Sequence, residues 1–257
     1  MDKPSIAVFA PDPSYLDKAT AIAQKLNLPY FQSDQAYQFL LLVTTDYIGI
    51  QPYPTSKIKP LYVDFLSPTM QYRKNQASLR KEAIARAMGV KPQDNPIIVD
   101  ATAGLACDSF ILASLGFTVT LLERSPILHL LVDNAIQRAV ANPIAAPIVN
   151  RLQLIHTNAI TWFEQYKLAE NPLPHVIYLD PMFPERRKSA QVKKEMRMLQ
   201  AIIGEDNDAD QLFMTALTCA TQRVVVKRPR LAPPLAGRPP AFQLLGKSSR
   251  FDVYITR

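Results

Sequence analysis

Short apolar runs alternate with segments of helical spacing through the second half of this chain. The apolar runs predict buried strands over residues 97–100, 117–122, 152–155, 175–179 and 224–226. The segments between them predict helices over residues 105–115, 125–141, 160–166 and 211–220. Such regular alternation of strand and helix is typical of a doubly wound parallel sheet. Two further apolar runs, 242–245 and 251–255, predict a hairpin that closes this sheet.

The first 90 residues show a different order of elements and predict a small α/β domain. Strands are expected over residues 5–9, 39–43, 47–50 and 61–66, and helices over residues 15–28 and 67–88. Ser67 and Pro68 provide the N-terminal cap of the second helix, and Gly89 provides its end. A polar, proline-flanked link, 91–96, follows. We therefore predict one domain over residues 1–90 and a second over residues 91–257.

Basic residues gather in three segments of a chain whose formal net charge is +7. Residues 71–91 contain six basic side chains and one acid, and residues 223–250 contain seven basic side chains and no acid. The third segment follows directly after Phe183. Clustered positive charge favours a polyanion as partner, and nucleic acid is the partner that we expect.

The remaining composition excludes several classes of protein. No apolar run is long enough to span a membrane, and the amino-terminal residues do not resemble a signal peptide. Cys107 and Cys219 lie far apart and form no C-x-x-C motif, so neither a disulfide scaffold nor a metal site is predicted. These features favour a reduced, cytoplasmic compartment.

The stretch Asp180-Pro181-Met182-Phe183-Pro184 follows the predicted strand 175–179. It is therefore expected at the carboxyl edge of the sheet, where open α/β sheets bind their ligands. The Asp180 carboxylate can accept one N–H of a planar exocyclic amine, and the backbone carbonyl of Pro181 can accept the other. Phe183 offers a ring on which a base can stack. We therefore predict Asp180, Pro181 and Phe183 as catalytic residues.

A second motif, Asp100-Ala-Thr-Ala-Gly104, lies between a predicted strand and a predicted helix, as a nucleotide-binding turn does. Glu123 ends the next strand, where an acid can accept both hydroxyl groups of a ribose. The turn has the single glycine Gly104, which does not favour a pyrophosphate ligand. An adenosine that carries an amino acid fits better, with Asp100 and Asp108 at its cationic end. S-adenosylmethionine has this chemistry.

Four segments together resemble the bacterial ribosomal RNA small-subunit methyltransferase J family: D-A-T-A-G-L-A-C-D at 100–108, L-L-E-R at 121–124, Y-L-D-P-M-F-P at 178–184 and V-V-V-K-R-P at 224–229. The resemblance implies a Rossmann-like, class I S-adenosylmethionine-dependent methyltransferase that forms N2-methylguanosine in 16S ribosomal RNA or in the small ribosomal subunit. It implies cofactor contacts at Cys107, Asp108, Glu123, Arg124, Asn158, Ala159 and Asp180. The chain departs from the family at Ala106-Cys107, usually Gly-Arg, and at Asn158-Ala159, often two serines; only contacts through backbone N–H groups survive such changes.

Six cations near the same sheet edge are predicted to contact RNA phosphates: Arg186, Arg187, Lys188, Lys227, Arg228 and Arg230. Other acceptors for the methyl group stay open at this point, namely adenine N6 in RNA or DNA, or a protein amide. A non-catalytic RNA-binding protein with a remnant pocket is a further alternative. The single-glycine turn and the lack of an evident hydride-transfer acid argue against a nicotinamide dehydrogenase.

Overall fold

The computed structural model describes residues 5–54, 58–182, 202 and 207–256. Its contacts divide the chain into two compact units. The first unit contains Met1–Asp64, Leu130–Ala135 and Met182–Glu205, and the second contains Phe65–His129, Ile136–Pro181 and Asp206–Arg257. Each unit is described below by itself.

The first unit contains a three-stranded sheet of order β1-β2-β3. Strand β1 (Ile6–Phe9) is parallel to β2 (Phe39–Val43), and β2 is antiparallel to β3 (Ile48–Pro52). Helix α1 (Leu16–Leu26) packs on β1 and ends at Asn27, whose backbone is left-handed. These elements confirm the predicted strands and helix to within a few residues.

The prediction of a strand over residues 61–66 was wrong. Within the described part of the chain, Leu61 forms an isolated bridge with Ile50, and residues 62–66 belong to no strand. Val63 and Phe65 are nevertheless buried, while Tyr62 is exposed. The alternation in the sequence therefore reports which side chains are buried, and it does not report whether the backbone joins a ladder.

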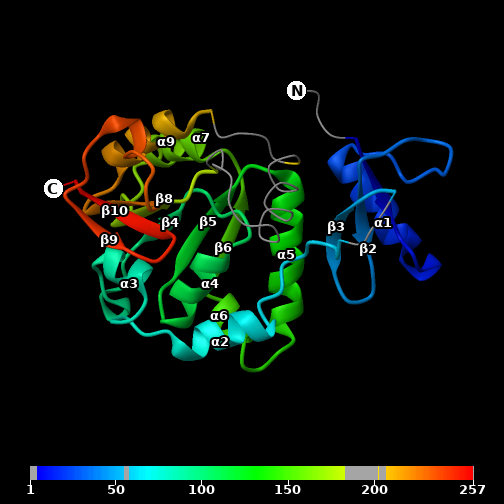
Figure 1. Cartoon of the computed structure of the whole chain (residues 1–257), viewed down its shortest axis with the longest axis horizontal. Coiled ribbons are helices and arrows are strands. Elements are labelled where there is room, and N and C mark those ends of the chain that lie inside the picture. The colour runs from blue at the N-terminus through cyan, green and yellow to red at the C-terminus, as the bar shows by residue number, and fades with distance from the viewer. Residues whose placement is uncertain (1–4, 55–57, 183–201, 203–206, 257) are drawn as a thin grey trace. The chain divides into compact units, whose positions relative to one another are not determined.

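The second unit is built on a seven-stranded sheet of order β6-β5-β4-β7-β8-β10-β9. Its strands are β4 (Ile98–Asp100), β5 (Val119–Glu123), β6 (Leu152–His156), β7 (Val176–Leu179), β8 (Arg223–Pro229), β9 (Phe242–Leu245) and β10 (Ser249–Ile255). Strands β4 to β8 are all parallel, and β10 is antiparallel to both β8 and β9 (Figure 1). The doubly wound sheet and its closing hairpin are thus confirmed.

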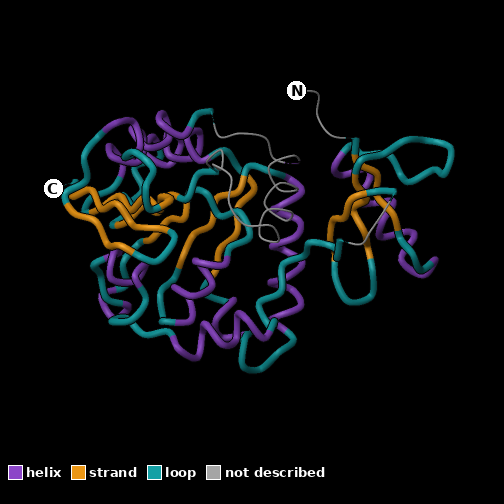
Figure 2. Tube along the Cα trace, viewed as in Figure 1, coloured by secondary structure: helices purple, strands orange, loops and turns teal. Residues whose placement is uncertain are grey.

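Helices cover both faces of this sheet. Figure 2 shows α7 (Ala159–Leu168) and α9 (Ala209–Cys219) on one face, and α2 (Pro68–Gln76), α4 (Cys107–Ser114) and α6 (Ala146–Val149) on the other. Helix α5 (Pro126–Val140) begins as predicted, with Ser125 Oγ accepting from the backbone N–H of Leu128. Among the residues that the structure describes, no helix is long and apolar enough to cross a membrane.

The segment 67–88 forms two helices where the sequence predicted one. Helix α2 ends at Ala77, whose backbone is extended, and α3 (Ala83–Met88) begins after Glu82. Ser78 offers its hydroxyl and its carbonyl to the N–H of Lys81, a local pairing that competes with a continuous helix. Helices α2 and α3 pack against α4, and α3 also against β8 and β10, so contacts group residues 65–90 with the second unit. The predicted domain boundary at residue 90 stays a prediction.

Candidate active site

The end of β7 is tied directly to the turn that follows β4. Strands β4 and β7 are parallel neighbours, so both end at the same edge of the sheet. The Ala101 N–H donates to the Tyr178 carbonyl at 3.0 Å, and the Asp180 N–H donates to Thr102 Oγ1 at 2.6 Å. Asp180 and Pro181, predicted to hold the acceptor, thus lie beside the predicted cofactor turn.

Glu123 joins the cofactor turn to the end of β5. Its Oε2 accepts from the Gly104 N–H at 2.8 Å, and its Oε1 accepts from the Ser125 N–H at 2.7 Å. The Glu123 side chain is buried, and the Ala103 N–H donates to the Leu122 carbonyl at 3.1 Å. The carboxylate is therefore fixed against the glycine turn, where the sequence predicts a ribose.

Gly104 has the left-handed φ of 54°, which glycine adopts without strain. Among the described residues, a Cβ built there would meet only the Thr102 carbonyl oxygen, at 3.8 Å. Ala106, two residues later, also has a left-handed φ of 57°, although it carries a Cβ. The turn therefore combines a glycine without steric strain and a strained alanine, Ala106, at the position where the family resemblance implies glycine.

Asp100, the last residue of β4, is almost fully buried. Its Oδ2 accepts from the Ser109 hydroxyl, and its Oδ1 accepts from the Thr102 N–H at 3.1 Å. Burial raises the pKa of Asp100 to about 7, although both hydrogen bonds oppose the shift. A cation bound beside this carboxyl would favour its ionised form.

Asp108, in the first turn of α4, is the centre of a charged network. Its Oδ2 lies 2.8 Å from Lys227 Nζ and accepts from the Tyr178 hydroxyl at 2.8 Å, and its Oδ1 lies 2.9 Å from Arg73. Burial alone would raise the pKa of Asp108, but Lys227 and Arg73 outweigh it and hold that pKa below its usual value. Lys227 also lies 2.8 Å from Asp180 Oδ2. The two carboxylates keep the pKa of Lys227 above its usual value, against the effect of its burial.

The other predicted cofactor residues follow the ends of β5 and β6 or, for Cys107, the turn after β4. Asn158 caps α7, because its Oδ1 accepts from the N–H groups of Ile160 and Thr161 at 2.9 and 3.3 Å. Ala159 is buried beside it. Arg124 NH1 is held by both oxygens of Asp208, at 2.8 and 2.9 Å. Cys107 is exposed in the first turn of α4. Their contacts with a cofactor stay predictions.

The six cations predicted to contact phosphates differ in whether they are engaged within the protein, exposed, or outside the described residues. Lys227 is engaged by Asp108 and Asp180, and Arg228 is buried, with its guanidinium donating to the Pro233 carbonyl at 2.6 and 3.0 Å. Arg230 is exposed. The predicted residues Phe183, Arg186, Arg187 and Lys188 lie outside the described residues.

Three residues of the site were not singled out from the sequence. Arg73 comes from α2, in a basic cluster that predicted RNA contact, and it binds Asp108 instead. Tyr178, two positions before Asp180, donates its hydroxyl to Asp108, the carboxylate that shares Lys227 with Asp180. Thr102 is the central residue of the cofactor turn, and its hydroxyl accepts from the Asp180 N–H. The hydroxyl of Tyr178 within an otherwise apolar strand, two positions before Asp180, was the signal that could have pointed to it.

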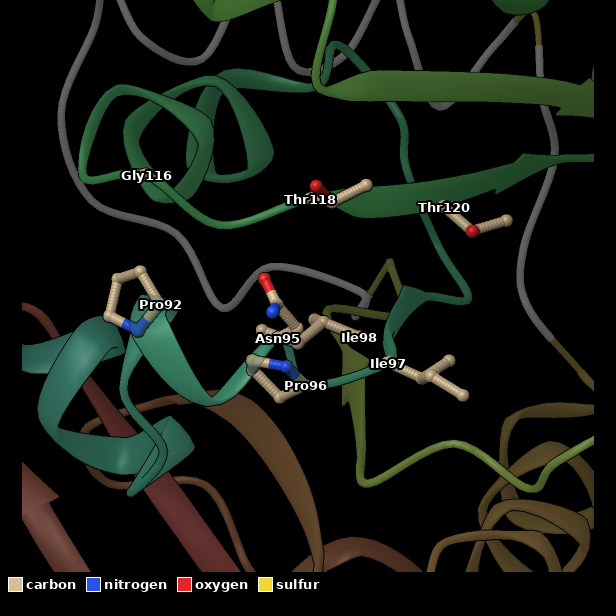
Figure 3. A pocket seen from close by; sticks show the side chains of 8 residues that line it. All are labelled: Pro92, Asn95, Pro96, Ile97, Ile98, Gly116, Thr118 and Thr120. Atoms are coloured by element: carbon tan, nitrogen blue, oxygen red, sulfur yellow. The ribbon is translucent and has the colours of Figure 1, made fainter.

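A pocket of about 220 Å³ lies at the opposite, amino-terminal edge of the sheet (Figure 3). Its lining includes Asn95, Ile97 and Gly116, and none of the predicted site residues. The acids of the site gather instead where β4, β5 and β7 end. The buried Asp100, the anchored Glu123 and the glycine turn at Gly104 fit S-adenosylmethionine, which offers a cation, a ribose and no phosphate.

Comparisons with known proteins agree with this arrangement. The family described as "Putative SAM-dependent methyltransferase" matches residues 21–256. The ribosomal RNA small subunit methyltransferase J of Thioalkalivibrio sulfidiphilus is 44% identical over 240 residues, which cover 93% of each chain. That of Nitrosococcus oceani is 48% identical over 197 residues, 77% of each chain. A solved SAM-dependent methyltransferase from Neisseria gonorrhoeae has a TM-score of 0.75 and 34% identity, covering 98% of this chain and 95% of its own.

Proposed function

Because this chain belongs to the ribosomal RNA small subunit methyltransferase J family of S-adenosylmethionine-dependent methyltransferases, we propose that it forms N2-methylguanosine in 16S ribosomal RNA. The observation that carries the proposal is the position of Asp180 and Pro181. They follow β7 at the edge where Asp100 ends the neighbouring strand β4 and Glu123 ends β5, the strand beyond it. An acceptor held by Asp180 would therefore lie next to a cofactor held by Glu123.

On the acceptor side, Asp180 and Pro181 position a weak nucleophile. The lone pair of the guanine amine is delocalised into the ring, so catalysis depends on orientation. Asp180 accepts one N–H of the amine, and the Pro181 carbonyl accepts the other. Lys227 keeps Asp180 in place through its contact with Oδ2. Phe183, the predicted stacking residue, belongs to the same proposal.

On the cofactor side, the chain supplies acids and backbone donors. Glu123 receives the ribose hydroxyls, the turn at Gly104 leaves room for the nucleoside, and Asp100 and Asp108 face the amino-acid end. Cys107, Arg124, Asn158 and Ala159 are proposed as further contacts. When bound, S-adenosylmethionine supplies an electrophilic methyl group. The contribution of the protein is to hold the amine and the methyl donor in line and to exclude water.

The partner is proposed to be 16S ribosomal RNA or the small ribosomal subunit, and the location to be the cytoplasm. The basic segments of the chain support a polyanionic partner. The guanine must be unpaired or flipped before its N2 edge can enter the site. Arg230, exposed just beyond β8, is the described cation that best suits a phosphate contact.

The test is label transfer from S-adenosylmethionine to ribosomal RNA from a strain that lacks this enzyme, followed by digestion to nucleosides. We expect the label in N2-methylguanosine. Asp180→Ala should abolish it, while cofactor binding, measured by calorimetry, should weaken far less, because the other proposed cofactor contacts are retained. Turnover by Asp180→Ala at the rate of the unchanged enzyme would overturn the role of Asp180.

The same digest separates the alternative functions, which family membership does not favour. Label in N6-methyladenosine would retain the enzyme class and replace the acceptor. Absence of label together with absence of cofactor binding would support an RNA-binding protein with a remnant pocket. The intact Asp100, Glu123 and Asp180 argue against that outcome.

A further inference from the structure

The loop Pro229–Pro233, here called the clamped loop, presents an exposed leucine at the edge of the sheet that carries the site. Leu231 is 94% exposed, the highest value among the exposed large hydrophobic side chains of the described residues. Exposed leucines are common singly on protein surfaces and need no explanation by themselves. Leu231 does need an explanation, because the backbone around it is held by an unusual set of hydrogen bonds.

Two buried arginines hold the clamped loop by its carbonyl groups. Arg228 donates to the Pro233 carbonyl through two nitrogens, and Arg250 NH1 donates to the carbonyls of Pro229 and Arg230 at 3.1 and 2.7 Å. Arg250 is itself paired with the fully buried Asp252, at 2.7 and 3.0 Å. Burial of a guanidinium is costly unless its hydrogen bonds are satisfied, so the carbonyl groups of this loop are strongly fixed.

The clamped loop is close to the acceptor end of the site. Leu179 of β7 pairs with Val226 of β8, which places Lys227 beside Asp180. Leu231 follows Lys227 by four positions, so its Cα is at most about 14 Å from that of Lys227, and nearer because the Ala232 N–H turns back to the Pro229 carbonyl. The clamped loop therefore continues from the strand end that carries Lys227, on the acceptor side of the site.

The charge around Leu231 suits a polyanion. Residues 223–250 contain no acid, and the carboxylate of Asp210, from α9, accepts from the Ala236 N–H, three residues beyond the loop. Arg230 is exposed, and its backbone N–H donates to the Ser248 carbonyl at 3.0 Å, which brings the turn with the exposed Lys247 alongside. An apolar side chain on a fixed backbone, near exposed cations, matches the form of the wedges by which proteins enter stacked bases.

We propose that Leu231 is an RNA wedge, which enters the base stack beside the target and occupies the place that the flipped guanine leaves. The inference rests on the proposed function and names a specific contact within it. The clamped loop keeps Leu231 in position before RNA binds, so little conformational entropy is lost at that step. The wedge offsets part of the cost of unstacking the target.

The test compares Leu231→Ala with Leu168→Ala on 16S ribosomal RNA from a strain that lacks the enzyme. Leu168, the last residue of α7, is 83% exposed, and α7 runs away from the carboxyl edge, so Leu168 is a matched control at the opposite edge. We expect Leu231→Ala to lower kcat/KM for RNA by roughly 10- to 100-fold, the size of an unstacking cost. Leu168→Ala should not change it, and Leu231→Met should retain most of the activity.

Thermal unfolding and cofactor affinity should be equal in all four proteins, because neither leucine is buried. Equal kcat/KM in the unchanged enzyme and Leu231→Ala would overturn the wedge. So would a loss confined to assembled small subunits and absent with naked RNA, since Leu231 would then contact a protein. Failure of the unchanged enzyme to label any nucleoside would instead count against the proposed function.

Discussion

The ammonium group of Lys227 lies 2.8 Å from Oδ2 of Asp180. It also lies 2.8 Å from Oδ2 of Asp108, which accepts from the Tyr178 hydroxyl as well. One cation therefore connects the carboxylate proposed to hold the guanine amine with a carboxylate proposed to face the cofactor. The Lys227 side chain is only 29% exposed, so water screens these attractions less than it would at the surface.

Replacement of Lys227 should impair the chemical step more than RNA binding. We expect Lys227→Met to lower kcat by about 100-fold, because Asp180 loses the group that fixes its position. Lys227→Arg retains the charge and should recover part of the rate. The measurement is kcat and KM for ribosomal RNA, with thermal unfolding as the check on folding. A higher KM with unchanged kcat would assign Lys227 to phosphate binding, as the sequence alone predicted.

The buried Asp100 should make stability depend on pH. Its pKa is raised to about 7 by burial, so the folded protein holds this proton more tightly than the unfolded chain does. The contribution of Asp100 to the free energy of unfolding therefore falls as pH rises from about 4 to about 7. Asp100→Asn lacks this titration. As pH rises from 5 to 8, the free energy of unfolding of the variant should increase by on the order of 2 kcal/mol relative to that of the unchanged protein.

Urea denaturation of both proteins at four pH values in this range provides the measurement. Charges near Asp100, chiefly Asp108 and Asp180, are present in both proteins and largely cancel in the difference. Parallel curves for the two proteins would mean that Asp100 is ionised across the range, which would contradict the raised pKa.

What the sequence could predict here was local. The alternation of strands and helices, the cap at Ser67 and the acids at strand ends depend on neighbours within a few residues, and the structure has each of them. The partners of Lys227 could not be predicted, because Asp108 is 119 residues away in the sequence and only the sheet brings them together. Arg73 was assigned to a basic patch because its partner, Asp108, also lies far from it in the sequence. Asn158 did carry a local signal, since asparagine before a helix often caps it.

The left-handed backbone at Ala106 should be relieved by glycine. A non-glycine residue with φ of 57° is strained by its Cβ, and glycine is not, although glycine also loses more freedom on folding. We expect Ala106→Gly to increase the free energy of unfolding by about 0.5–1 kcal/mol. Ala141→Gly is the matched control, because Ala141 is an exposed residue with φ of −72° and has no such strain.

In thermal unfolding, Ala106→Gly should raise Tm by about 2 °C, and Ala141→Gly should lower it slightly. A lower Tm for both variants would show that packing of the buried Ala106 methyl group stabilises the fold by more than the backbone strain destabilises it.

Arg230 should contribute one phosphate contact to RNA binding. Its side chain is exposed just beyond β8, in the segment that contains no acid. Each neutralised phosphate releases counterions, so the loss of one contact reduces the slope of log K against log salt concentration by about 0.7–0.9. We expect Arg230→Gln to show this reduction and to bind ribosomal RNA more weakly at low salt.

The matched control is Lys167→Gln, which removes one exposed charge from the last turn of α7, at the other edge of the sheet. Filter binding at several salt concentrations measures both slopes. If the two variants lose the same small amount of affinity with unchanged slopes, the net charge of the protein and not a contact at Arg230 is what attracts the RNA.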